Sequence, residues 1–89
     1  MGEIDEARRL SESAHALYTR LNNEMGCAAA LYHQAFLYEQ QGNLAGAIRC
    51  LEQVVAIDEK YGLPKLAENK MRLSRLRAVR DSDPFREPT

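Results

Sequence analysis

The sequence predicts an all-α fold, a solenoid of helical hairpins built from four antiparallel helices. Two observations support this prediction. Apolar residues recur every three or four positions through most of the 89 residues, which is the period of a helix with one buried face. Helix-ending residues gather at three short joints, around residues 22–23, 42–43 and 62–64. Helices joined by short connections pack as antiparallel neighbours.

The first helix is expected over residues 3–21. Three acidic residues near its start place negative charge at the positive end of the helix dipole. Its apolar residues form one stripe that we expect to face the core: Ile4, Ala7, Leu10, Ala14, Leu17 and Leu21. Asn22 and Asn23 end the helix, because asparagine adopts left-handed and capping conformations.

The second helix is expected over residues 24–41. Its inward stripe is predicted to contain Met25, Ala28, Leu31, Ala35 and Tyr38. Three further residues widen the apolar surface: Tyr32, Phe36 and Leu37. Because a helix that is apolar on more than one side contacts more than one neighbour, we expect this helix to be central. Gly42 then stops the helix and Asn43 caps the next one.

The third helix is expected over residues 44–61 and the fourth over residues 64–80, with Pro64 in its first turn. The apolar face of the third helix comprises Leu44, Ala47, Ile48, Leu51, Val54, Val55 and Ile57. The apolar members of the fourth helix are Leu66, Ala67, Met71, Leu73, Leu76 and Val79. The fourth helix is also the most basic element, which makes its outer face a candidate contact for an acidic partner.

Small and apolar residues of the first helix recur in register in the third helix. The matching pairs are Ala7 with Ala47, Leu10 with Cys50, Ala14 with Val54, and Leu17 with Ile57. The middle of the chain fits one family pattern residue by residue, with Leu31, Ala35, Tyr38, Gly42, Leu44 and Ala47 in order. In order, the pattern places a large apolar, a small and an aromatic residue on the first helix of the repeat and a glycine at the turn. An apolar residue follows directly after the turn, and an alanine stands early in the second helix. The chain thereby resembles the tetratricopeptide repeat family, in its longer variant.

This resemblance implies a repeat domain over residues 1–80, with one full repeat at about 28–61. The first helix would be the second helix of a preceding repeat. The last helix would be the first helix of a following repeat or a terminal cap; Ser74 stands at its small position, but Arg77 stands where an aromatic is usual. Residues 81–89 hold two prolines without apolar period and are expected to form a flexible tail.

Composition and charge exclude several classes. Apolar residues make up 45% of the chain and charged residues 28%, which excludes a disordered chain. The two cysteines form no disulfide framework, and without a signal peptide or a membrane-length apolar run we expect a cytoplasmic protein that contacts no membrane. Residues 1–62 carry a net charge of −4 and residues 63–89 one of +3. The acidic part of one molecule could therefore attract the basic part of another. The alternative is that both charged surfaces are simply solvated.

The resemblance implies that a partner binds on a concave surface lined by the first helix of each repeat. Carried over to this chain, the lining positions are Ala29, Tyr32, Phe36, Glu39 and Gln40, with Arg72 and Arg75 from the last helix. Aromatic side chains anchor apolar or mixed peptides well. The alternative is that Tyr32 and Phe36 pack against neighbouring helices. Members that clamp a C-terminal carboxylate use Lys and Asn at these two aromatic positions, so we expect no carboxylate clamp here.

No residue set indicates an enzyme, a cofactor or a metal site. His15 and His33 lie on different predicted helices without ligand spacing, and Cys27 and Cys50 are expected to be buried packing residues. We therefore expect a non-catalytic module that binds a protein or peptide. The alternative is a regulatory helical domain of a larger signalling or transcription protein, whose basic fourth helix contacts nucleic acid or an acidic partner. Because the chain as a whole is slightly acidic, nucleic acid is the weaker expectation.

The predicted helix order leaves the first helix without its usual partner. Repeat arrays generally cover their apolar faces with about three repeats. The chain is then either part of a longer array or a small protein that covers its open face by self-association. We favour a fragment that forms a homodimer in isolation.

Overall fold

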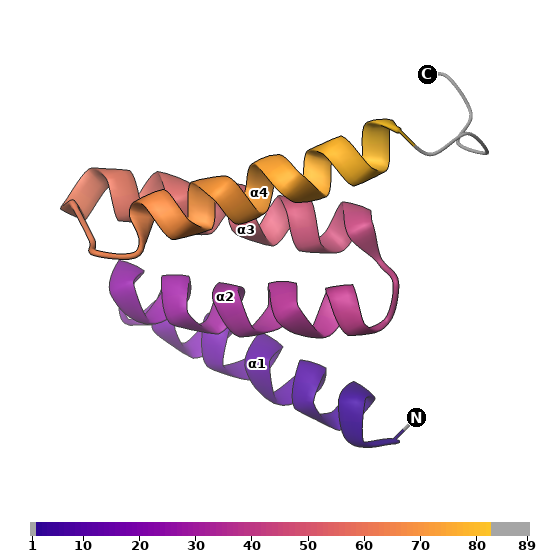
Figure 1. Ribbon diagram of the computed structural model, residues 1–89. Helices are drawn as coiled ribbons and strands as arrows, with labels where there is room; N and C mark the ends of the chain where they lie inside the picture. The colour runs from indigo at the N-terminus through magenta and orange to yellow at the C-terminus, as the bar shows by residue number, and fades with distance from the viewer. Residues whose placement is uncertain (1, 83–89) are drawn as a thin grey trace.

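The computed structural model describes residues 2–82, which form four α-helices in a sequential stack (Figure 1). The helices are α1 (Gly2–Arg20), α2 (Glu24–Gln40), α3 (Leu44–Tyr61) and α4 (Leu66–Asp81). Each helix packs against its neighbours in the chain, so α1 and α4 lie at opposite ends of the stack. The all-α solenoid predicted from the sequence is confirmed. Asp81 ends α4, and residues 83–89 of the predicted tail lie outside the described residues.

The first two joints share one capping geometry. Asn22 has φ 55° and Gly42 has φ 75°, the left-handed conformation that ends a helix. The following residues, Asn23 and Asn43, each accept a hydrogen bond through the side-chain oxygen, at 2.9 Å, from the backbone N–H three residues later. The predicted roles of these asparagines and of Gly42 are confirmed.

The α3–α4 joint departs from the prediction at one residue. Gly62 ends α3 in the left-handed conformation, with φ 60°, as expected. However, α4 begins at Leu66, so Pro64 lies in the preceding turn rather than in the first helical turn. Two backbone hydrogen bonds hold this turn: the N–H of Leu63 donates to Asp58 at 2.9 Å, and the N–H of Leu66 donates to Leu63 at 3.2 Å.

The core lies between α2, α3 and α4. Its buried members come from those three helices: Leu31, Ala35, Ala47, Ile48, Cys50, Leu51, Val54, Val55, Leu73 and Leu76. Tyr38 packs against this core with its ring over Gly46, where a Cβ atom would come within 2.9 Å of the ring. This close approach is the physical reason for a glycine in the first turn of α3. Cys27 and Cys50 are both buried and unpaired, as predicted.

The predicted core stripe of α1 is wrong at three leucines. Leu10, Leu17 and Leu21 have exposed fractions of 66%, 50% and 64%. The reason is geometric: α1 packs on α2 alone within residues 2–82, and its apolar face is wider than one neighbouring helix covers. The half-buried residues Ala7 and Ala14 of the same stripe lie toward the covered side.

Further apolar residues predicted to face inward lie in solvent. Met25 in α2 is 53% exposed, and the inner face of α2 contains Cys27 and Gln34 in addition to the predicted residues. Ala28, Leu31 and Ala35 are buried as predicted, and the additional buried residues follow because α2 packs against both α1 and α3.

The apolar residues of α4 divide in the same way. Ala67, Met71 and Val79 are exposed, because the buried face of α4 turns toward α3 through Leu73 and Leu76. No helix within residues 2–82 is long and apolar enough to cross a bilayer.

Candidate partner-binding groove

A row of apolar side chains runs along the outer face of α2. Met25, Ala29, Tyr32 and Phe36 are spaced by four, three and four positions, which places them on one side of the helix. Ala29 is exposed, Tyr32 is half-buried and Phe36 is 49% exposed. Since α2 buries its other sides against α1 and α3, this row is the face it leaves open.

A groove of about 420 Å³ lies beside this row. One wall is α2, with Met25, Ala29 and Tyr32, and the opposite wall is the α3–α4 turn, with Leu63 and Lys65. Its lining is mainly apolar, with His33 also at the edge. A mainly apolar concavity with a few polar groups is typical of a ligand-binding site.

The floor of the groove contains a buried polar pair that the sequence pattern did not reveal. The side-chain amide of Asn69 in α4 donates to a carboxylate oxygen of Asp58 in α3 at 2.8 Å. Both residues are buried, with exposed fractions of 3% and 4%. The hydrogen bond gives the buried carboxylate a donor and links α4 to α3 at the groove. The sequence signal that could have revealed this pair is a single polar residue within the otherwise apolar stripe of each helix.

Arg72 reaches from α4 across to α2. Its guanidinium lies 5.3 Å from the ring centre of Tyr32 and 6.0 Å from that of Phe36, and it forms an ion pair with Glu39. The Lys65 ammonium lies 5.6 Å from the centre of the same Tyr32 ring. These distances allow cation–π attraction. Within residues 2–82, α2 and α4 meet through these long side chains rather than through close backbone packing.

The predicted site residues thus divide into two sets. The structure brings Tyr32, Phe36, Glu39 and Arg72 into one cluster, and it places Ala29 in the adjoining groove. The other two, Gln40 and Arg75, are exposed and make no hydrogen bond or ion pair with the cluster in the described part of the chain. Tyr32 combines both expected roles, since it packs beside two cations and also lines the groove.

Most cations of α4 have intramolecular acidic partners. Arg77 binds Glu52 of α3 at 2.7 Å, and Lys70 lies 3.8 Å from Glu59. Arg72 binds Glu39 as described. The basic helix is therefore largely neutralised by acids of α2 and α3, which reduces the field that a nucleic acid would sense.

The open end of the α2–α3 hairpin, where α2 begins and α3 ends, has its own polar cluster. The Lys60 ammonium and the Tyr61 hydroxyl both donate to Glu24, at 2.7 Å and 2.5 Å. The hydrogen bonds from Lys60 and then Tyr61 hold the pKa of Glu24 below its usual value.

The buried thiol of Cys50 lies elsewhere, between α3 and α2. Its Sγ lies 3.8 Å from the side-chain oxygen of Gln34, and burial raises the pKa of this thiol. Because a raised pKa lowers the fraction of thiolate, Cys50 is an internal packing group rather than a reactive one.

Comparison with known proteins identifies one family. Residues 1–60 match the family model described as tetratricopeptide repeat. This match covers α1, α2 and nearly all of α3. Comparison with curated proteins finds no match, and comparison with solved structures finds none either.

Proposed function

Because the chain belongs to the tetratricopeptide repeat family, we propose that it is a non-catalytic interaction module that binds a peptide or protein segment in the α2 groove. Members of this family are generally protein–protein interaction modules. The observation that carries the proposal is the open apolar row of α2 beside the 420 Å³ groove. Contiguous exposed apolar surface next to a concavity is typical of a protein contact site.

The chemistry of the groove defines the expected ligand. The space between Ala29, Tyr32 and Leu63 suits one large apolar side chain of an extended or helical segment. Lys65 at the rim supplies a positive charge, so an acidic residue next to that apolar anchor would gain a charge-assisted contact. We propose a segment that carries an apolar anchor flanked by acid.

Selection from a random peptide library displayed on phage, with immobilised protein as bait, tests this proposal. Selected peptides should lose most of their affinity for the variants Tyr32→Ala and Phe36→Ala, measured by isothermal titration calorimetry. Tyr61→Ala, which removes an exposed aromatic outside the groove, is the matched control and should bind normally. Undiminished binding by both Tyr32→Ala, in the groove, and Phe36→Ala, in the adjoining apolar row, would exclude this site.

Salt dependence and ligand charge separate the proposal from its alternative. Groove binding should weaken only modestly between low and high salt, because salt screens just the one contact with Lys65, whereas contact of α4 with a nucleic acid would weaken steeply as counterions are released. Amidation of a selected peptide's C-terminus should leave its affinity unchanged, because Tyr32 and Phe36 cannot form a carboxylate clamp.

We also propose that copies of the chain associate with one another. The support is the amount of apolar surface that α1 leaves in water within the described residues, at Leu10, Leu17 and Leu21. A cytoplasmic location is proposed as well, because Cys27 and Cys50 are unpaired thiols.

A further inference from the structure

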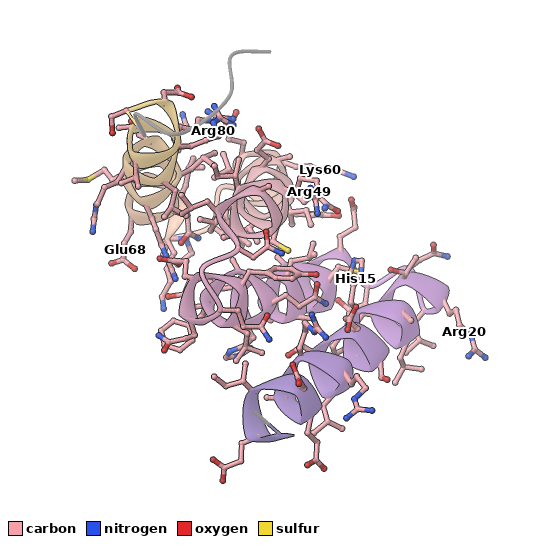
Figure 2. All side chains as sticks on the ribbon, turned by 90° about the vertical axis from the view of Figure 1, so that its right-hand side faces the viewer. His15, Arg20, Arg49, Lys60, Glu68 and Arg80 are labelled. Carbon is pink, nitrogen blue, oxygen red and sulfur yellow. The ribbon has the colours of Figure 1, made fainter. Side chains whose placement is uncertain are left out.

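The two ends of the helix stack carry different uncovered faces. At one end, Leu10 and Leu17 lie seven positions apart on one side of α1, and Leu21, four positions further, directly follows the end of the helix, with its N–H donating to the carbonyl of Leu17 at 3.0 Å. We call these three residues the leucine strip. At the other end, a groove of about 570 Å³ runs between α3 and α4. Figure 2, turned by 90° from Figure 1, shows α1 and α4 on opposite sides of the molecule.

The α3–α4 groove has an apolar floor with ionic edges. Val55, Ala56 and Leu73 line it, and the Arg77–Glu52 ion pair lies at one edge. We call this the end groove. It is distinct from the groove beside α2, which has none of these residues in its lining. Nothing else in residues 2–82 packs into it.

We propose that the leucine strip of one copy docks into the end groove of a second copy, so that the chain assembles head to tail. This inference rests on the self-association proposed above and specifies its arrangement. The occupant is a second copy because α1 and α4 match each other as the two helices of one repeat.

The equivalence of α1 with α3 shows what the leucine strip requires. Leu10 and Cys50 occupy equivalent positions of the repeat. On α3 that position is buried, and the thiol of Cys50 lies 3.8 Å from Gln34 of α2. On α1 the same position is uncovered, with Leu10 66% exposed. The leucine strip therefore lies on the side of α1 against which a helix equivalent to α2 would pack.

The helix equivalent to α2 is α4, in the alignment that pairs Ser74 with Ala35 and Arg77 with Tyr38. If α4 and a second copy's α1 pack as α2 and α3 do, Leu73 takes the place of Gln34, and Leu10 of the second copy takes the place of Cys50. The contact between Gln34 and Cys50 is then replaced by a contact between these two leucines. The close approach of Tyr38 to Gly46 becomes an approach of Arg77 to Glu6. The first pair is apolar and the second is oppositely charged.

The charge distribution favours the same orientation. Within α1, four acidic residues against three arginines give a net charge of −1, and within α4 five basic residues against two acidic ones give +3, so the end of one copy that bears α1 weakly attracts the end of another that bears α4. A pairing of two leucine strips would instead bring like ends together. Contact between two different faces does not close on itself by symmetry, so it produces an open series of copies rather than a single dimer.

Complementation between two surface variants tests the arrangement by sedimentation velocity. Leu10→Glu places a charge in the leucine strip, and Ala56→Arg fills the end groove; both positions are exposed, so the fold should persist, as far-UV circular dichroism will show. Each variant keeps one intact face. Ala16→Glu on α1 and Gln53→Arg on α3 are matched controls, exposed and outside both faces.

The wild-type chain and both controls should show a sedimentation coefficient that rises with concentration past that of a dimer. Each variant alone should be monomeric, and an equimolar mixture should form a dimer and stop there. A wild-type monomer at every concentration would overturn self-association altogether. A wild-type dimer that grows no further, persists in Ala56→Arg and is lost in Leu10→Glu would overturn only the head-to-tail arrangement, in favour of paired leucine strips. Variants that remain monomeric when mixed would overturn it too.

Discussion

Gly46 offers a direct test of how the α2–α3 interface is packed. In a helix, alanine is favoured over glycine by about 1 kcal/mol, so propensity alone predicts that Gly46→Ala stabilises the fold. The structure predicts the opposite. A Cβ atom at residue 46 would lie 2.9 Å from Cγ of Tyr38 and 3.0 Å from both Cδ atoms, whereas ordinary contacts begin at 3.4 Å. The ring or the helix must therefore shift by several tenths of an ångström.

Overpacking of this kind costs about 1–3 kcal/mol. Setting this cost against the gain in propensity, we expect Gly46→Ala to lower the free energy of unfolding by up to about 2 kcal/mol. In a Tyr38→Leu background the ring is gone, so the same substitution should become neutral or stabilise by up to about 1 kcal/mol. The coupling energy between residues 38 and 46 should thus be about 1–3 kcal/mol.

Urea unfolding of the four proteins, followed by circular dichroism, measures this coupling at a fixed protein concentration. Gly42→Ala is not a suitable control, because its φ of 75° penalises any side chain. Ala45→Gly, at an exposed position one residue away, reports the propensity term alone. Equal effects of Gly46→Ala in both backgrounds would refute the claim that the Tyr38 ring excludes a side chain.

Three further predictions concern the core, the groove floor and pH. Leu51→Ala should destabilise the fold by about 3–5 kcal/mol in urea titrations, since Leu51 is fully buried, whereas Leu10→Ala at low protein concentration should change stability by less than about 1 kcal/mol. Asn69→Ala should cost about 1.5–3 kcal/mol, because it leaves a buried carboxylate without its donor; an unchanged unfolding midpoint would contradict this. The pKa of Glu24 is lower in the folded chain than its ordinary value of 4.5, so the ionised carboxylate stabilises the fold at any pH above 4.5. That stabilisation disappears as the pH falls through the lower, folded-state pKa. As the pH is lowered from about 6 to about 3, the urea midpoint should therefore fall less in Glu24→Gln than in the wild type. The variant has no carboxylate at residue 24 that could be protonated and so lose its ion pair with Lys60.

The groove could be predicted only in part. Family-pattern positions identified Tyr32, Phe36, Glu39 and Arg72, which the structure brings together. Lys65 was missed, because the sequence placed it inside the fourth helix rather than in the turn that forms the groove wall. Side chains that meet from distant parts of the sequence depend on how two helices are rotated, and no local pattern records that rotation.

The sequence by itself determined the four helices, their order and their joints. Period, capping asparagines and turn glycines act within a few residues, so they can be read locally. Only the tertiary structure decided which apolar stripe is covered. Leu51 and Leu10 occupy similar stripes, yet one is fully buried and the other is 66% exposed. The difference arises because α3 has packed neighbours on two sides and α1 has one among the described residues, and burial depends on neighbours rather than on the stripe itself.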